Sequence, residues 1–246
     1  MLEVARLTPT PGKCYHPDMA AFLDRADAGR QLAAHLIEYA DRPDVIALAL
    51  PRGGVPVAFE VARRLKVGLD VFLVRKLGVP GHPELAMGAI AAGGVEVLNR
   101  QLIQDLGIPA AVVQQAAVSE RTELDRRDRA FRGDRQPPVV RDRIVILIDD
   151  GLATGATMEA AIVALRRLEP ETIVVAVPVG AHETCQRLHL LADRLVCLVT
   201  PVPFSAVGQW YRDFSQTTDD EVRRLLGIAG SPGAAKPEAR AGSRGL

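Results

Sequence analysis

The 246-residue sequence has few cysteines and lysines, and no net charge. The three cysteines, Cys14, Cys185 and Cys197, form no CxxC pair, so the sequence predicts neither a zinc site nor a disulfide framework and favours a reducing compartment. Thirty Lys and Arg residues balance thirty Asp and Glu residues. This balance argues against a broad electrostatic surface for nucleic acid or for an anionic membrane. Any bound anion must therefore meet a local site.

Long apolar runs are also missing. The longest, around Val45–Leu50 and Ile173–Ala181, fall well short of the roughly 20 residues that a membrane span needs. The first 19 residues lack the apolar stretch of a signal peptide. We therefore expect a cytoplasmic protein with no membrane or nucleic-acid partner.

The chain is long enough for one large domain. Residues 1–20 show no periodicity, and we expect them to form an N-terminal tail. Residues 230–246 (GSPGAAKPEARAGSRGL) are rich in Gly, Ala, Pro and Arg, and we expect a disordered C-terminal tail. The domain is predicted to span residues 21–229, with a helical insertion over 99–140 whose charged part, 120–135, is expected to be solvated or to face a second subunit.

Between the tails, short β-branched apolar runs alternate with amphipathic helical stretches. This alternation predicts an α/β fold with a parallel sheet and helices on both faces. Ligands of such sheets bind beyond the carboxyl ends of the strands. Strands are expected at 45–50, 70–74, 143–148, 172–177 and 195–199, a hairpin over 86–98, and helices near 28–40, 55–65, 101–131, 156–168 and 183–191.

The strongest signal is the loop from Asp149 to Thr157. The apolar run 144–148 predicts a buried strand, and it leads directly into Asp149 and Asp150. A loop of small residues follows, and then a helix whose apolar stripe packs on the sheet. The N-terminus of that helix offers free N–H groups and the positive end of the helix dipole, which together bind anions.

Three residues of this loop add to the anion site. Gly155 lets the backbone approach a ligand closely, while Thr154 and Thr157 supply hydroxyl donors. Two carboxylates would repel a bare phosphate. They suit a ligand that also carries hydroxyl groups or a hydrated metal ion.

The segment VILIDDGLATGAT resembles the diphosphate-sugar motif of the type I phosphoribosyltransferase family: four apolar residues, two acidic residues and Thr-Gly-x-Thr. The resemblance is greatest to bacterial predicted phosphoribosyltransferases. It implies a type I phosphoribosyltransferase-like fold with a small hood, in which dimers are common. It also implies transfer of a phosphoribosyl group from 5-phosphoribosyl-1-diphosphate to a small acceptor, expected to be a nucleobase, with Mg²⁺ as cofactor.

The resemblance also implies residue roles. Asp149 and Asp150 would hold the ribose hydroxyls and touch Mg²⁺ mainly through water. The 5-phosphate would be wrapped by Ala153, Thr154, Gly155, Ala156 and Thr157, and Gly151 would also contact the sugar diphosphate. Oxopurine-specific relatives carry an acidic residue at the position of Ala153, so the identity of the base stays open.

A second loop, Pro51–Pro56, follows the first predicted strand and resembles the family's diphosphate loop. Arg52 would act as a fork-shaped donor to the diphosphate, with Gly53 and Gly54 giving a tight backbone. The alternative is a simple turn that carries an exposed arginine.

Lys76 is one of only four lysines and is expected at the end of the second strand, where the family places a basic residue near the diphosphate. Residues 77–88 have the Gly/Pro pattern of a mobile loop. His82 and Glu84 could approach the substrate when such a loop closes, although an exposed loop histidine is commonly uninvolved.

Residues 200–220 are expected to contribute the hood, because the segment around Trp210 resembles that of purine-type members. Trp210 or Tyr211 would stack on the base, and Asp213 would reach metal-bound water. The alternative is that both aromatic rings pack the C-terminal helix onto the core.

Three functions remain open at this point. The first is the transferase reaction, in which Asp149, Asp150, Arg52 and Lys76 would be the catalytic residues. The second is a regulator that binds the sugar diphosphate without chemistry. The third is hydrolysis or phosphorolysis of a related phosphosugar.

Overall fold

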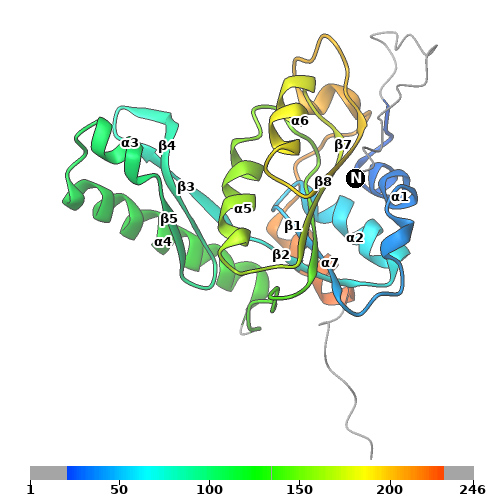
Figure 1. Ribbon diagram of the computed structural model, residues 1–246. Coiled ribbons are helices and arrows are strands. Elements are labelled where there is room, and N and C mark those ends of the chain that lie inside the picture. The colour runs from blue at the N-terminus through cyan, green and yellow to red at the C-terminus, as the bar shows by residue number, and fades with distance from the viewer. Residues whose placement is uncertain (1–20, 134, 230–246) are drawn as a thin grey trace, which may run out of the picture.

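The computed structural model describes residues 21–133 and 135–229, so both predicted tails lie outside the described residues. Its centre is a parallel five-stranded sheet of order β2-β1-β6-β7-β8 (Figure 1). The predicted α/β class with a parallel sheet is confirmed. The strands are β1 (Val45–Ala49), β2 (Gly68–Val71), β6 (Ile144–Ile148), β7 (Thr172–Val179) and β8 (Arg194–Val199).

Helices cover both faces of this sheet. Alternate residues of each strand enter opposite core clusters: Ala47 packs in one and Ile46 in the other. The first face carries α1 (Arg25–Ala34), α2 (Gly54–Leu65) and α7 (Asp219–Ala229), and the second carries α5 (Ala156–Arg166) and α6 (His182–His189). Two short 3-10 helices, η1 (Ile37–Tyr39) and η2 (Val207–Trp210), complete the main body.

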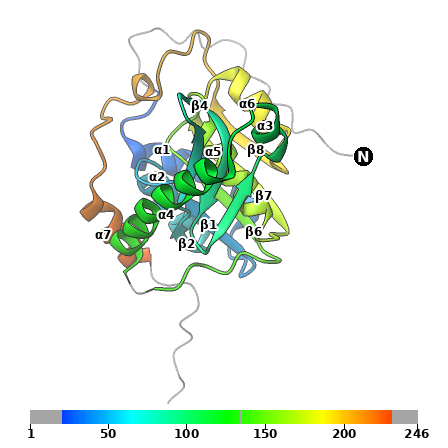
Figure 2. The same cartoon turned by 90° about the vertical axis from the view of Figure 1, so that its left-hand side faces the viewer.

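A second unit, residues 74–132, projects to one side of the main body, and we call it the arm (Figures 1 and 2). It holds an antiparallel sheet of order β3-β4-β5 and two helices. The elements are β3 (Val74–Val79), β4 (His82–Ala91), β5 (Val95–Leu98), α3 (Arg100–Asp105) and α4 (Ala110–Arg132). The predicted hairpin over 86–98 and the helical insertion therefore form one unit.

Two predictions for this region are wrong. The strand expected at 70–74 is split, because β2 ends at Val71 in the main sheet and β3 begins at Val74 in the arm. The segment 77–88 is a hairpin and not a long loop. Its Gly/Pro signal marks only the tight turn at Pro80–Gly81, where Gly81 has a φ of 78°.

The charged run at 120–135 is only partly a solvated face. Leu124 and Phe131 are buried, and the side chain of Arg132 is 1% exposed. Its guanidinium donates to Asp70 at 3.2 Å and to the carbonyl of Val71 at 2.7 Å. The arginine joins α4 to the end of β2 and so holds the arm against the main body.

No helix in the described part of the chain is long and apolar enough to cross a membrane.

Candidate functional site

The two predicted acids lie where β6 ends, at the carboxyl edge of the main sheet. Oδ1 of Asp149 accepts the backbone N–H of Asp150 at 2.9 Å, and Oδ2 of Asp150 accepts Nε of Arg25 at 2.8 Å. Among the described residues, no donor reaches Oδ2 of Asp149 or Oδ1 of Asp150. The pair therefore presents one open carboxylate oxygen from each residue.

Burial dominates the electrostatics of this pair. It raises the pKa of Asp149 well above its ordinary value, and the neighbouring Asp150 carboxylate raises it further. Burial also raises the pKa of Asp150, while the hydrogen bond from Arg25 opposes that rise. A donor or cation that arrived at the open oxygens would favour the ionised forms.

The loop that follows the acids is held by β7 and α6. The N–H of Leu152 donates to the carbonyl of Val179 at 2.9 Å, and Oγ1 of Thr184 donates to the carbonyl of Ala153 at 2.7 Å. Gly155 has a φ of 73°, and a Cβ on it would lie 2.5 Å from Thr184. Both the positive φ and the short distance to Thr184 therefore disfavour any side chain at this position.

The carbonyls of residues 152–155 accept hydrogen bonds, whereas most N–H groups of the loop donate none. Within 21–133 and 135–229, five backbone N–H groups at the start of α5 have no acceptor within good geometry: those of Ala153, Thr154, Gly155, Thr157 and Met158. Thr154 and Thr157 are exposed at the same place. This helix N-terminus has the donors that an anion such as phosphate needs.

The second predicted loop lies against the acids. A Cβ added to Gly53 would lie only 2.0 Å from Oδ2 of Asp150, and one on Gly54 would lie 2.6 Å from the carbonyl oxygen of Ile148. The two glycines therefore allow the loop after β1 to contact the acid pair. The Pro51–Arg52 peptide bond in this loop is cis.

Arg52 does not reach the acid pair. Its Nε lies 3.5 Å from Oδ1 of Asp219, in the first turn of α7, and its side chain is 41% exposed. Nothing in the sequence pattern pointed to Asp219 as its partner.

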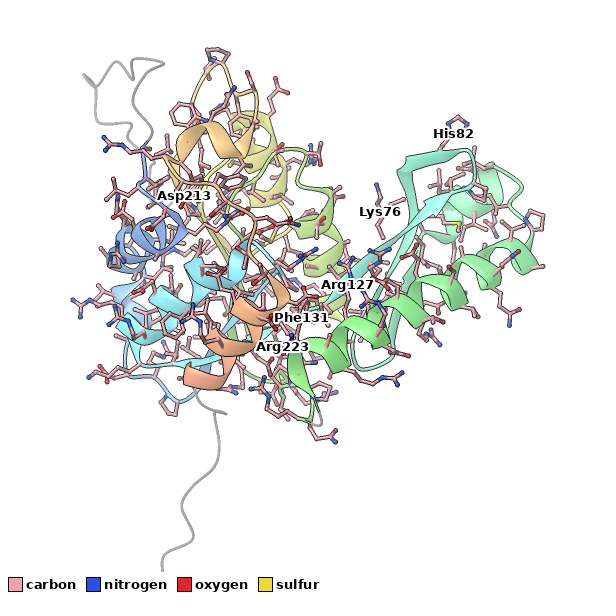
Figure 3. All side chains as sticks on the ribbon, turned by 180° about the vertical axis from the view of Figure 1, so that it is seen from behind. Lys76, His82, Arg127, Phe131, Asp213 and Arg223 are labelled. Atoms are coloured by element: carbon pink, nitrogen blue, oxygen red, sulfur yellow. The ribbon has the colours of Figure 1, made fainter. Side chains whose placement is uncertain are left out.

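Lys76 is not at a strand end. It lies inside β3, opposite Ala89 of β4, so it belongs to the arm (Figure 3). His82 begins β4 at the far end of the arm, and the side chain of Glu84 is outside the described set. The prediction failed because the apolar run of β2 continues into β3 without a break in composition.

Two arginines of the arm do approach the loops. Arg75 of β3 and Arg127 of α4 line a small cavity of about 30 Å³ together with Pro51 and Thr157. Arg127 is labelled in Figure 3. Each guanidinium is paired within the arm, Arg75 with Glu120 at 2.5 Å and Arg127 with Glu123 at 2.7 Å. Sequence patterns did not single out either arginine, because Arg75 lies beside Lys76 in an apolar stretch and Arg127 lies in the charged run 120–135.

The segment 200–220, predicted as the hood and called the hood segment below, contains η2. Tyr211 is 5% exposed, its ring lies between Phe22 and Phe214, and its hydroxyl donates to the carbonyl of Asp150 at 2.6 Å. A ring held in this way packs the hood onto the site. Trp210 is half-buried in the same cluster.

Asp213 is exposed and lies in the later part of the hood segment (Figure 3). Its Oδ1 accepts the backbone N–H of Ser215 at 2.9 Å, and this bond lowers the pKa of the carboxyl below its ordinary value. The carboxylate therefore shapes the local turn.

These features define an anion site beside a pair of acids on a parallel α/β sheet. The model of the phosphoribosyl transferase domain family matches residues 84–207, which is half of the chain, and the chain belongs to this family. The match includes the Asp149–Thr157 loop and begins after the Pro51–Pro56 loop.

Particular relatives agree with this assignment. The chain is 48% identical over 208 residues to a Mycobacterium tuberculosis (strain CDC 1551 / Oshkosh) protein named "Putative phosphoribosyl transferase MT0597", over 85% of this chain and 47% of that protein. It thus spans about half the length of the curated relatives that it matches. The crystal structure of TT1426 from Thermus thermophilus is 42% identical, with a TM-score of 0.77, over 83% of this chain and 97% of that one.

Proposed function

We propose that this protein transfers a phosphoribosyl group from 5-phosphoribosyl-1-diphosphate to a nitrogen nucleophile, which we expect to be a nucleobase, and releases diphosphate. The observation that carries the proposal is the pairing of two features within one loop. Free N–H groups at the start of α5 suit a terminal phosphate, and the open oxygens of Asp149 and Asp150 suit two neighbouring hydroxyls. A ribose 5-phosphate offers this combination.

The site offers two carboxylates that could bind magnesium. Mg²⁺ prefers carboxylate, water and phosphate oxygens and is commonly held by one or two carboxylates plus the substrate. Asp149 and Asp150 supply two such carboxylates, and no cluster of three metal-ligating side chains occurs in the described part of the chain. In the proposed complex the ion would be held mainly by the substrate and by water, and it would supply positive charge to the diphosphate.

The chain's own groups would act on both sides of the bond that breaks. Loss of diphosphate leaves positive charge on the anomeric carbon, which the buried carboxylates of Asp149 and Asp150 stabilise. Negative charge grows on the departing oxygens. Arg52, half-exposed and 3.5 Å from Asp219, can exchange that carboxylate for the diphosphate with little loss, because an exposed ion pair contributes little.

Lys76 is proposed to assist from the arm, as are the two arginines that line the small cavity. These groups can meet the diphosphate only if the arm and the loops stay adjacent, which the buried Arg132–Asp70 pair favours. The glycines at 53 and 54 keep the Pro51–Pro56 loop in contact with the acid pair, so groups of both loops can act on the same substrate.

A diphosphate-release assay tests the proposal. The purified protein is incubated with 5-phosphoribosyl-1-diphosphate, Mg²⁺ and a panel of nucleobases, and diphosphate is measured with and without each base. Release that depends on one base supports the transferase. Release without any base would overturn the transferase proposal in favour of hydrolysis. Binding of the sugar diphosphate without any release would overturn it in favour of a regulator.

Asp150→Asn and Arg52→Ala are each expected to lower turnover by roughly 10²–10³, the usual cost of removing one preorganised charge.

A further inference from the structure

The side chain of Arg25 joins three parts of the molecule. Its Nε donates to Oδ2 of Asp150 at 2.8 Å, and its Nη1 donates to the carbonyl of Ser215 at 2.7 Å. Its guanidinium carbon lies 3.9 Å from the centroid of the Phe214 ring. Only 11% of this side chain is exposed. Arg25 is therefore fixed by the acid pair on one side and by the hood segment on the other.

The backbone just before Arg25 is joined to the same segment. The N–H of Phe22 donates to the carbonyl of Trp210, and the N–H of Arg212 donates back to the carbonyl of Phe22, at 3.0 and 2.9 Å. The N–H of Asp213 then donates to the carbonyl of Leu23 at 2.9 Å. The segment before α1 and the hood segment are thus joined by backbone hydrogen bonds, and Arg25 connects them to Asp150.

Arg25 also determines which oxygen of Asp150 stays open. Oδ2 is enclosed, since it accepts from Arg25 and lies 2.0 Å from where a Cβ of Gly53 would be. Oδ1 receives no donor from the described residues. A carboxylate that is anchored through one oxygen cannot rotate freely, so the other oxygen keeps a constant direction.

We propose that Arg25 is a positioning residue: it anchors Asp150 so that Oδ1 meets a sugar hydroxyl, and it holds the hood segment through Ser215 and Phe214. This inference rests on the proposed function for its ligand, and on the contacts above for its link to the hood. The guanidinium suits this task because its planar fork serves two acceptors and one ring face at once.

Three variants test whether Arg25 positions Asp150 for the sugar diphosphate. Arg25→Gln removes the charge, and Arg25→Lys keeps a charge that can reach one acceptor only. Arg30→Gln is the matched control, because Arg30 is on the same helix, is 50% exposed and is 3.6 Å from its nearest acid, Asp27. Calorimetry with 5-phosphoribosyl-1-diphosphate and Mg²⁺ should show at least about tenfold weaker binding for Arg25→Gln, partial recovery for Arg25→Lys and wild-type binding for Arg30→Gln.

The link between Arg25 and the hood segment is tested without ligand. Trp210 is the only tryptophan of the chain and lies in the hood, so its fluorescence reports on that segment alone. Acrylamide should quench it more strongly in Arg25→Gln and in Arg25→Lys than in the wild type or in Arg30→Gln. Circular dichroism confirms that each variant is folded before it is compared.

The outcomes separate this inference from the proposed function. If the wild type takes up the sugar diphosphate and Arg25→Gln matches it in both affinity and quenching, the inference is overturned and the function stands. If the wild type takes up no sugar diphosphate, the proposed function is overturned together with the role of Arg25 in positioning Asp150. Stronger quenching in Arg25→Gln then still supports the link to the hood, and unchanged quenching overturns that link too.

Discussion

Tyr211 donates its hydroxyl hydrogen to the backbone carbonyl of Asp150 at 2.6 Å. The ring of Tyr211 is buried, and its centroid lies 5.4 Å from that of Phe22 and 5.1 Å from that of Phe214. Burial raises the pKa of the Tyr211 hydroxyl above its ordinary value, so the group remains a donor at any physiological pH. The hood is therefore joined to the backbone of the acid pair itself.

Tyr211→Phe should destabilise the protein without disturbing the aromatic packing. The change leaves the carbonyl of Asp150 without its donor, which costs about 1 to 3 kcal/mol for a buried group. Urea denaturation at pH 7 measures the free energy of unfolding. An unchanged free energy would show that water replaces the hydroxyl and that the hood is not held by this bond.

Gly53→Ala should weaken uptake of the sugar diphosphate at least about tenfold. The added Cβ would lie 2.0 Å from Oδ2 of Asp150, so either the loop or the carboxylate must move. Gly227→Ala is the control, because Gly227 is in α7, the added carbon would meet no atom within 4 Å apart from chain neighbours and the nearby backbone of its own helix, and alanine is the better helix former. Calorimetric titration with 5-phosphoribosyl-1-diphosphate measures the affinity of both variants. Equal affinities would contradict the close contact between the two loops.

Arg132→Met should lower the free energy of unfolding by about 3 to 5 kcal/mol, since it leaves Asp70 buried without its partner. Arg129→Met, on the exposed side of the same helix, should change it by less than about 0.5 kcal/mol. Thermal and chemical unfolding measure both. Similar losses in the two variants would mean that the arm is not held by the buried pair.

The carboxylate of Asp193 should contribute stability that depends on pH. Burial alone would raise its pKa, but hydrogen bonds from Arg166 at 2.8 Å and from the N–H of Ile173 at 2.7 Å lower it below the ordinary value. Because the folded-state pKa is depressed, the contribution is present above the unfolded pKa of about 4 and is lost as pH falls through the folded-state value.

Asp193→Asn removes this charge and keeps one acceptor oxygen. The difference in free energy of unfolding between the wild type and this variant should therefore be larger at pH 7 than at pH 3. A difference that stays constant between the two pH values would contradict the assignment.

The main sheet and its loops could be predicted because their signals are local. The apolar strand 144–148, the acids that follow it and Gly155 all lie within one short stretch, and all five residues of that strand are buried. The parallel arrangement then places the loops after β1 and β6 side by side, since those strands are neighbours.

The rest of the site depends on contacts between distant segments. Arg25 and Asp150 are 125 positions apart, and Arg52 meets Asp219 across most of the chain. The arm could not be predicted for a related reason: the chain runs from β2 into β3 through the unbroken apolar stretch 71–74, so composition does not show that it passes from one sheet to another. Such pairings follow from topology, which single-sequence patterns do not encode.

The most direct test of the central claim is calorimetric titration of the purified wild type with 5-phosphoribosyl-1-diphosphate in the presence and absence of Mg²⁺, beside the Asp149→Asn and Asp150→Asn variants. We expect saturable uptake by the wild type that Mg²⁺ strengthens, and markedly weaker uptake by both variants. A folded wild type that takes up no sugar diphosphate, with or without Mg²⁺, would contradict the account.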